Sequence, residues 1–165
     1  MKYTLKTAKK TKDTQILTNI LKKGNNDDIS FSAVLNPNCP TEMLAEILKR
    51  ENDDAVSWNA AQNSNCSPEI LTEVLKRGND DAVSCNAAKN PNCPPEMLAE
   101  ILRRGKDDWV SYYAAGNQNC PPEARINWMM KVGKIKKEDP TKHIIEYENK
   151  KEDDFQDLKD LLKNC

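Results

Sequence analysis

The sequence predicts an all-α solenoid of about four and a half 27-residue two-helix repeats with a C-terminal capping tail. One observation is a phrase that recurs every 27 residues without insertions. The other is that apolar residues follow helical spacing twice within each interval. A constant period of this size indicates identical supersecondary units that bury their apolar faces against one another. The phrase occurs as Asn36-Pro-Asn-Cys39, Asn63-Ser-Asn-Cys66, Asn90-Pro-Asn-Cys93 and Asn117-Gln-Asn-Cys120.

Composition agrees with this fold class. Of the 165 residues, 5% are aromatic and 31% are charged, so a single globular core would contain few large apolar side chains. The formal net charge of −1 argues against a generic nucleic-acid binder, which usually has a basic excess. No apolar run reaches membrane-spanning length, and the N-terminal residues lack a signal-peptide core. We therefore expect a cytoplasmic protein with no membrane partner.

The first helix of each repeat, helix A, is expected directly after the repeated phrase. In the third repeat Pro94 fits the first helical position, with Cys93 at the N-cap and Glu96 at N3, as in a capping box. Gly105 fits a left-handed residue just past the end of the helix. The helix A apolar stripes are Ile16, Leu17, Ile20, Leu21; Met43, Leu44, Ile47, Leu48; Ile70, Leu71, Val74, Leu75; and Met97, Leu98, Ile101, Leu102.

The second helix, helix B, is expected after an acidic pair such as Asp107-Asp108, because acidic residues favour the positive end of the helix dipole. Val110 and Ala114 lie one turn apart and face the core, and Asn117 is expected to end the helix as a left-handed C-cap. The sequence leaves open whether helix B is α or partly 3₁₀. The equivalent core pairs are Ile29 and Ala33, Val56 and Ala60, and Val83 and Ala87.

The terminal repeats depart from the pattern, as the ends of repeat stacks do. The first repeat lacks the prolines, and the fifth loses the pattern after Glu123. There we interpret Trp128, Met129 and Met130 as a cap over the last core face. The solenoid domain is therefore expected to span residues 1–133.

Residues 134–165 are expected to form a charged linker and a C-terminal amphipathic helix. This helix would either cap the last repeat, the interpretation we favour, or seat in the groove of a partner. Its apolar side consists of Phe155, Leu158, Leu161 and Leu162.

The repeated motifs Asn-Pro-Asn-x-Pro-Pro-Glu-x-Leu, Asp-x-x-Val and Ala-x-Asn resemble the leucine-rich repeat variant family over roughly residues 9–124. The resemblance implies a right-handed superhelix of short paired helices, in the style of HEAT and armadillo stacks, and no single activity. The chain departs from the family in its slightly longer period and in having cysteine where threonine is usual. Nothing before Cys39 could form the iron–sulfur cluster that some members carry. Serine also stands where the family often has arginine, at Ser30, Ser57, Ser84 and Ser111.

The outward face of helix B is the predicted binding site. Its positions lie one residue before, two after and six after the core valine, pointing away from the core. Large aromatic residues are unexpected there in so aromatic-poor a chain, and Trp and Tyr are favoured interface anchors. The alternative is that these side chains pack between repeats or under the tail. We predict a non-catalytic scaffold that binds a protein or peptide through Phe31, Trp58, Gln62, Lys89, Trp109 and Tyr112.

Nucleic-acid binding is the alternative function, with basic pairs on phosphates and helix B aromatics on bases. These pairs also suit the C-terminal end of helix A, and the parallel acidic residues would screen them. The pairs are Lys22-Lys23, Lys49-Arg50, Lys76-Arg77 and Arg103-Arg104.

Neither catalysis nor metal binding is expected. The four repeated cysteines would lie roughly 8–10 Å apart, too far for a disulfide or a shared zinc ion. The only histidine is His143, in the tail, and no glycine-rich phosphate loop occurs. We therefore expect no cofactor, and a redox-responsive row of thiols is a third interpretation.

Overall fold

The computed structural model describes residues 3–135, and within them it contains ten α-helices and no strand. The predicted all-α class is therefore confirmed for this part of the chain, and helix B is α-helical. The chain divides into two compact units, Met1–Cys93 and Pro94–Cys165. The predicted C-terminal amphipathic helix lies outside the described residues.

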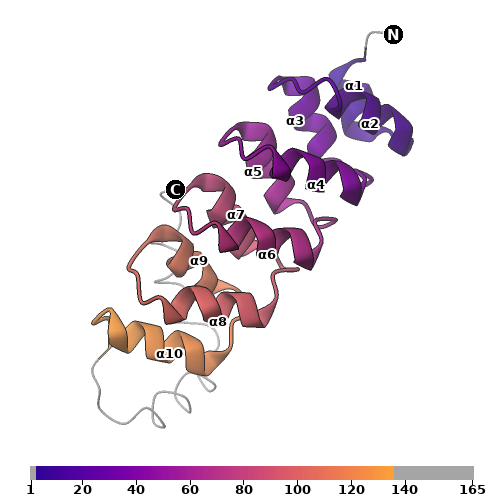
Figure 1. Cartoon of the computed structure of the whole chain (residues 1–165). Helices are drawn as coiled ribbons and strands as arrows, with labels where there is room; N and C mark the ends of the chain where they lie inside the picture. Colours follow the sequence, from indigo (N-terminus) through magenta and orange to yellow (C-terminus); the bar gives the residue numbers. More distant parts are fainter. Residues whose placement is uncertain (1–2, 136–165) are drawn as a thin grey trace. The chain divides into compact units, whose positions relative to one another are not determined.

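The two units contain the following helices (Figure 1). Unit 1 holds α1 Leu5–Lys10, α2 Thr14–Leu21, α3 Asp28–Val34, α4 Thr41–Lys49, α5 Ala55–Gln62, α6 Pro68–Lys76 and α7 Ala82–Lys89. Unit 2 holds α8 Pro95–Arg103, α9 Trp109–Gly116 and α10 Pro122–Lys131. Even numbers from α2 to α10 are helices A, and α3, α5, α7 and α9 are helices B.

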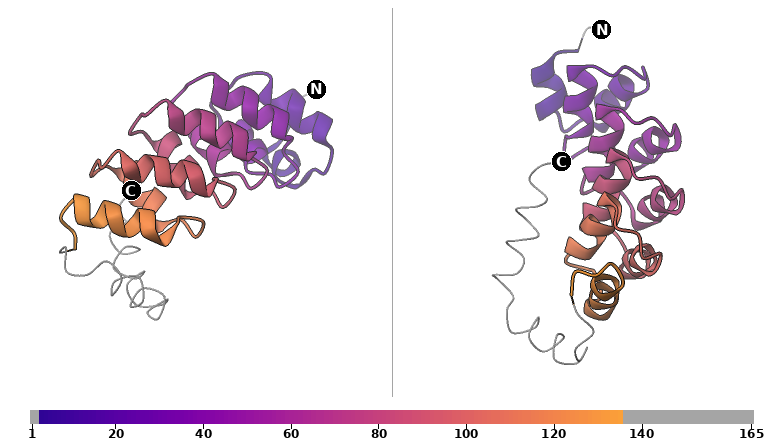
Figure 2. Two further views of the ribbon diagram at one scale, coloured as in Figure 1. Left: turned by 60° about the horizontal axis from the view of Figure 1, so that its bottom comes forward. Right: turned by 90° about the vertical axis from the view of Figure 1, so that its left-hand side faces the viewer.

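Within unit 1, equivalent helices lie side by side (Figures 1 and 2). α1, α3, α5 and α7 pack in series, and α4 packs on both α5 and α6. α1 precedes the repeats and was not predicted, although Thr4 caps it and its Ala8 is fully buried. Lys6, Lys9 and Lys10 near the N-terminus therefore belong to the first helix of the packed unit.

The predicted apolar stripes form the core. Leu17, Leu44, Leu71 and Leu98 of the helices A are fully buried, as are the small residues Ala33, Ala60, Ala87 and Ala114 of the helices B. Ile16 and Ile29 are only half-buried, because no helix A precedes α2 to cover them.

Helix A begins one residue later than predicted. Pro94 is the N-cap of α8 in extended conformation, and Pro95 is the first helical residue. A residue that precedes proline is driven out of the helical region, so Pro94 cannot be helical before Pro95. Cys93 therefore belongs to the preceding turn, its N–H donating to the Asn90 carbonyl at 2.9 Å, and Glu96 does not complete a capping box. The expected left-handed Gly105 is confirmed, with φ of 67°.

Helix B begins at the predicted acidic residues, and the structure shows how. Each N-cap aspartate accepts a hydrogen bond from the backbone N–H of a buried serine three residues later. These bonds are 2.7–2.9 Å long and join Asp27 to Ser30, Asp54 to Ser57, Asp81 to Ser84 and Asp108 to Ser111. Hydrogen bonding by Ser30 lowers the pKa of Asp27 below its ordinary value, which favours the charged cap.

The prediction for the end of helix B was wrong. Asn117 has φ of −69° and ψ of 138°, which is extended rather than left-handed. Asn63 and Asn90 adopt the same conformation. In Asn63 and Asn90 this conformation directs the side chain to backbone groups outside its own helix.

A row of buried asparagines, Asn36, Asn63 and Asn90, joins successive repeats of unit 1; we call it the asparagine ladder. Asn63 Nδ2 donates to the carbonyls of Val34 and Asn36, at 2.6 and 3.3 Å, while its Oδ1 accepts from the Asn65 N–H at 2.8 Å. Asn36 bonds the carbonyls of Ala8 and Thr11, and Asn90 those of Ala61 and Asn63. Each asparagine of the ladder therefore links its own turn to backbone carbonyls 25–29 residues earlier in the sequence.

Asn63→Ala is expected to lower the free energy of unfolding by about 2–4 kcal/mol, because buried carbonyls and one N–H lose their partner. Urea denaturation followed by circular dichroism measures this loss. Asn79→Ala, in an exposed loop of the same unit, is the control and should change stability by less than about 0.5 kcal/mol. Equal stability of the two variants would contradict the structural role of the ladder.

Candidate partner-binding surface

The predicted site residues of unit 1 lie on the outward face of α3, α5 and α7. Phe31 is 38% exposed and Trp58 36%, and they occupy the same register position on neighbouring helices. Leu35, one turn beyond Phe31 and six residues after Ile29, is at one of the predicted outward positions and is 43% exposed. Gln62 and Lys89 are also exposed, at the C-terminal ends of α5 and α7. We call Phe31, Leu35 and Trp58 the apolar platform.

The opposite face of the same helices explains why these side chains point outward. Val56 and Ala60 of α5 are buried, and a helix of eight residues has room for only one buried face. Trp58 lies between them in sequence and is left on the other face. Its Nε1 donates to Asp53 Oδ1 at 2.6 Å, which holds the indole against its own helix start. The five-residue separation of this pair gives no recognisable sequence signal.

An acidic edge, which we define as Asp28, Asp53 and Asp80, borders the platform at the N-terminal ends of these helices. All three aspartates are exposed, and the N-cap aspartates of the same helices lie next to them in sequence. Lys89, at the far end of α7, is the only basic residue within α3, α5 and α7. Acidic side chains therefore gather at the N-terminal ends of these helices, where they suit the positive ends of the helix dipoles.

In unit 2 the two predicted site residues have different environments. Trp109 is 42% exposed, whereas Tyr112 is half-buried between two tryptophans. The Tyr112 ring meets Trp128 edge to face at 5.4 Å between centroids, and Trp109 at 5.9 Å. Trp128 is itself buried, and its Nε1 donates to the Lys106 carbonyl at 2.8 Å.

Lys134, in the segment that follows α10, contacts the aromatic cluster of Trp109, Tyr112 and Trp128. Its Nζ hydrogen-bonds the Tyr112 hydroxyl, lies 3.2 Å from Asp107 Oδ1 and stands 4.1 Å from the centre of the Tyr112 ring. Burial by itself lowers the pKa of Lys134, but the hydrogen bonds with Tyr112 and Asp107 outweigh it and raise the pKa above its ordinary value. Tyr112 thus holds the end of the described chain in place, in addition to its predicted role as an anchor.

The basic pairs lie at the C-terminal ends of the helices A, and three of their arginines make polar contacts there. Arg50 pairs with Glu46 at 3.1 Å, and Arg104 with Glu100 at 3.8 Å. Arg77 donates to the Leu48 carbonyl at 3.0 Å and pairs with Glu51 at 3.4 Å, which links the ends of α4 and α6. These contacts agree with the interpretation that the pairs complement helix C-termini.

The repeated cysteines are buried free thiols. Cys39, Cys66, Cys93 and Cys120 are each at most 4% exposed. Burial raises the pKa of Cys39 and of Cys66 to about 12, and it also raises that of Cys120 despite the nearby Arg125. Among residues 3–135, no three His, Cys, Asp or Glu side chains are grouped as a metal site would require. The geometry supports a core role for these thiols and offers no reactive thiolate.

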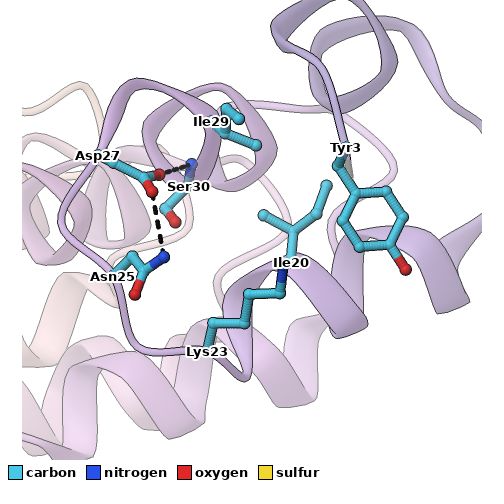
Figure 3. Close-up of a pocket in the computed structure, with 7 residues that line it drawn as sticks. All are labelled: Tyr3, Ile20, Lys23, Asn25, Asp27, Ile29 and Ser30. Carbon is cyan, nitrogen blue, oxygen red and sulfur yellow. Dashed lines mark hydrogen bonds between the residues drawn. The ribbon is translucent and has the colours of Figure 1, made fainter. Parts of the chain in front are cut away.

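An open pocket of about 410 Å³ lies at the N-terminal end of unit 1 (Figure 3). Ile20 and Ile29 line it beside Tyr3, whose ring is 5.2 Å from Lys23 Nζ. The Asp27 carboxylate on its wall already accepts from Ser30 N and Asn25 Nδ2. The pocket therefore occupies the place that a preceding helix A would fill. Its acidic residue, Asp27, is the N-cap of α3.

A second pocket, of about 440 Å³, lies between α8 and α10 in unit 2. Ala124 stands in α10 where the earlier helices A have the buried residues Met43, Ile70 and Met97. The smaller side chain leaves this hollow beside Leu102 and Trp128. Its presence follows from the loss of the repeat pattern in the fifth repeat.

Comparison of the chain with protein-family models, with curated proteins and with solved structures found no match. The resemblance to the leucine-rich repeat variant family therefore stays a prediction. In residues 3–135, every helix is too short or too polar to cross a membrane.

Tyr112→Ala is expected to lower the free energy of unfolding by about 2 kcal/mol, because it removes packing on Trp128 and the partner of Lys134. Trp109→Ala removes a more exposed ring and should cost less than about 1 kcal/mol. Urea denaturation of both variants beside the unchanged chain measures the difference. A stable Tyr112→Ala variant would show that the tyrosine serves only the surface.

At pH 9, Cys39 and Cys66 are expected to react with iodoacetamide at least about a hundredfold more slowly in the native chain than in urea, as mapped by mass spectrometry. The half-buried Cys85 is the internal reference. Since the folded state keeps these protons while the unfolded state releases them, stability should fall as pH rises from about 9 towards about 12. Fast native labelling of Cys39 would contradict its burial.

Proposed function

We propose that this chain is a non-catalytic repeat scaffold that binds a protein or peptide on its helix B surface. The observation that most strongly supports the proposal is the apolar platform of unit 1. Phe31, Leu35 and Trp58 are large and exposed in a chain with few aromatic residues, and Phe31 and Trp58 share a register position. Such side chains lose water-exposed apolar area when a partner covers them, and Trp is a frequent binding hot spot.

The wider architecture that we propose is a right-handed solenoid of the leucine-rich repeat variant type, spanning residues 1–133. Two features support it within unit 1. Asn63 and Asn90 of the asparagine ladder make the same hydrogen bonds 27 residues apart, and the N-cap aspartates repeat with the same period. Five cysteines of the described residues are free thiols, which fits a reducing compartment such as the cytoplasm.

Each predicted site residue has a defined place in this proposal. Phe31 and Trp58 are the anchors, with Leu35 added to them, while Gln62 and Lys89 form a polar border at the helix ends. Trp109 is a further anchor on unit 2. Tyr112 contributes through the exposed part of its ring, which also packs on Trp128 and Lys134.

Nucleic-acid binding stays a prediction without a structural observation that favours it. Arg50, Arg77 and Arg104 bond to glutamates or to a carbonyl at the ends of the helices A, whereas aspartates border the exposed aromatics. Phosphates and stacked bases would therefore need different surfaces of the described chain. Retention on a single-stranded oligonucleotide at low salt would support this alternative.

The test of the proposed function is capture of partners from native lysate by the full chain and by a Phe31→Ser/Trp58→Ser variant. The double variant is expected to lose at least about tenfold of the captured partner, because two anchors are removed. Glu73→Ser, on the exposed side of α6, is the matched control and should capture as much as the unchanged chain. Equal capture by all three proteins, each with an unchanged melting temperature, would place the binding surface elsewhere.

A further inference from the structure

The first repeat of unit 1 has a helix B in front of it but no helix A. Asn36 donates to the carbonyls of Ala8 and Thr11, at the end of α1. Asn63 and Asn90 donate to the equivalent carbonyls at the end of the preceding helix B. α1 therefore stands in the place of a helix B that precedes α3. Among the described residues, no helix takes the matching helix A place in front of α2.

Two apolar residues of the first repeat lack the cover that their counterparts have. Ile16 of α2 and Ile29 of α3 are half-buried, whereas the same positions in later repeats of unit 1 are at most 6% exposed. Ile20 and Ile29 line the pocket of about 410 Å³ at this end of the unit (Figure 3). We call Ile16, Ile20 and Ile29 the N-terminal groove. The covered counterparts are Met43 and Ile70 for Ile16, and Val56 and Val83 for Ile29.

The sequence contains one further copy of the helix A pattern, in residues 154–163, which lie outside the described part of the chain. In each helix A from α2 to α8, a leucine is followed by any residue, a polar residue, an aliphatic residue, a second leucine and a basic residue. Asp154 falls at the N-cap position of this pattern, as Asp13 does in α2. The copies are Leu17-Thr-Asn-Ile-Leu-Lys22, Leu44-Ala-Glu-Ile-Leu-Lys49, Leu71-Thr-Glu-Val-Leu-Lys76, Leu98-Ala-Glu-Ile-Leu-Arg103 and Leu158-Lys-Asp-Leu-Leu-Lys163.

One residue of the segment indicates which end of a stack it fits. The residue before the first leucine is Ile16 in α2, and its counterparts in α4 and α6 are buried because a helix A precedes them. This position therefore faces the preceding helix A. In the segment it is Asp157, and a carboxylate is costly to bury without a partner. The segment suits a helix A with no helix A in front of it, whereas behind α10 it would turn Asp157 towards α10.

We propose that residues 154–163 of a second copy of this chain bind in the N-terminal groove as the helix A in front of α2. The leucines of the segment cover Ile16 and Ile29, and Asp157 stays in solvent. The contact repeats the packing of one helix A on the next, as between α4 and α6. Docking between copies depends only on unit 1 and on the segment. Because the groove and the segment are different surfaces, the association is head-to-tail and extends to further copies.

Sedimentation velocity of the full chain at rising concentration tests this association. The unchanged chain is expected to form larger species as its concentration rises. The segment variant, Leu158→Ser/Leu162→Ser, removes apolar side chains that the groove would bury. The groove variant, Ile16→Lys/Ile29→Lys, places two charges there. Each is expected to weaken association at least about tenfold, because apolar contact area is lost.

A matched control and a mixture identify the two surfaces as partners. Asn52→Lys/Asn79→Lys adds the same charge in exposed loops of unit 1 and should associate as the unchanged chain does. The groove variant keeps the segment, and the segment variant keeps the groove. Neither should associate alone, whereas their mixture should form a one-to-one complex and nothing larger. Melting temperatures measured in parallel show whether each variant is folded, and the segment variant leaves the described helices unaltered.

Three results would overturn the proposal. One is an unchanged chain that stays monomeric at every concentration, and another is association that persists in the segment variant. The third is a mixture of the two folded variants that forms no complex. Asp157→Leu should leave both the association and the melting temperature unchanged, since the side chain stays in solvent. A higher melting temperature of a monomeric Asp157→Leu chain would instead place the segment behind α10, as the cap expected from the sequence.

Discussion

The architecture of unit 1 depends on one interaction, the hydrogen bonding of a buried amide between successive turns. Each asparagine of the ladder donates to carbonyls of the previous repeat and accepts from an N–H of its own turn. These turn groups are buried away from water, where an unmet backbone group is costly. A carboxylate could not donate, and an apolar side chain could do neither. The requirement for one group that does both explains why asparagine recurs at this position.

The ladder also determines where the exposed apolar platform lies. Because it ties the C-terminal ends of α3 and α5 to the preceding turns, while aspartate caps begin the same helices, each helix B is held at both ends. Small alanines then let neighbouring helices B approach closely on the buried side. Because one face of each helix B is buried in the core, a helix of seven or eight residues exposes its remaining side chains to solvent. Phe31 and Trp58 become neighbours because they share a register position, although 27 residues separate them.

Charge is divided between the two layers of unit 1 by the same helix ends. Arginines gather where the helices A end and bind carbonyl or glutamate oxygens there. Aspartates gather where the helices B begin, and half of them are used as caps. The near-neutral chain therefore carries an acidic border beside its exposed aromatic residues, which net charge alone does not reveal. The buried thiols and the N-cap aspartates, in contrast, serve the fold itself.

The sequence by itself determined the helical class, the pairs of short helices, the buried stripes and the outward position of Phe31 and Trp58. These features depend on local periodicity and on residues within one turn of each other, so a single repeated pattern was enough to predict them. Only the tertiary structure decided that helix A starts after Pro94, that Asn117 is extended and that residues 5–10 form a packed helix. It also decided that Tyr112 packs on Trp128 and Lys134, side chains that follow it by 16 and 22 residues. Such contacts depend on where distant segments meet in space, and on which buried backbone groups then need a hydrogen-bond partner.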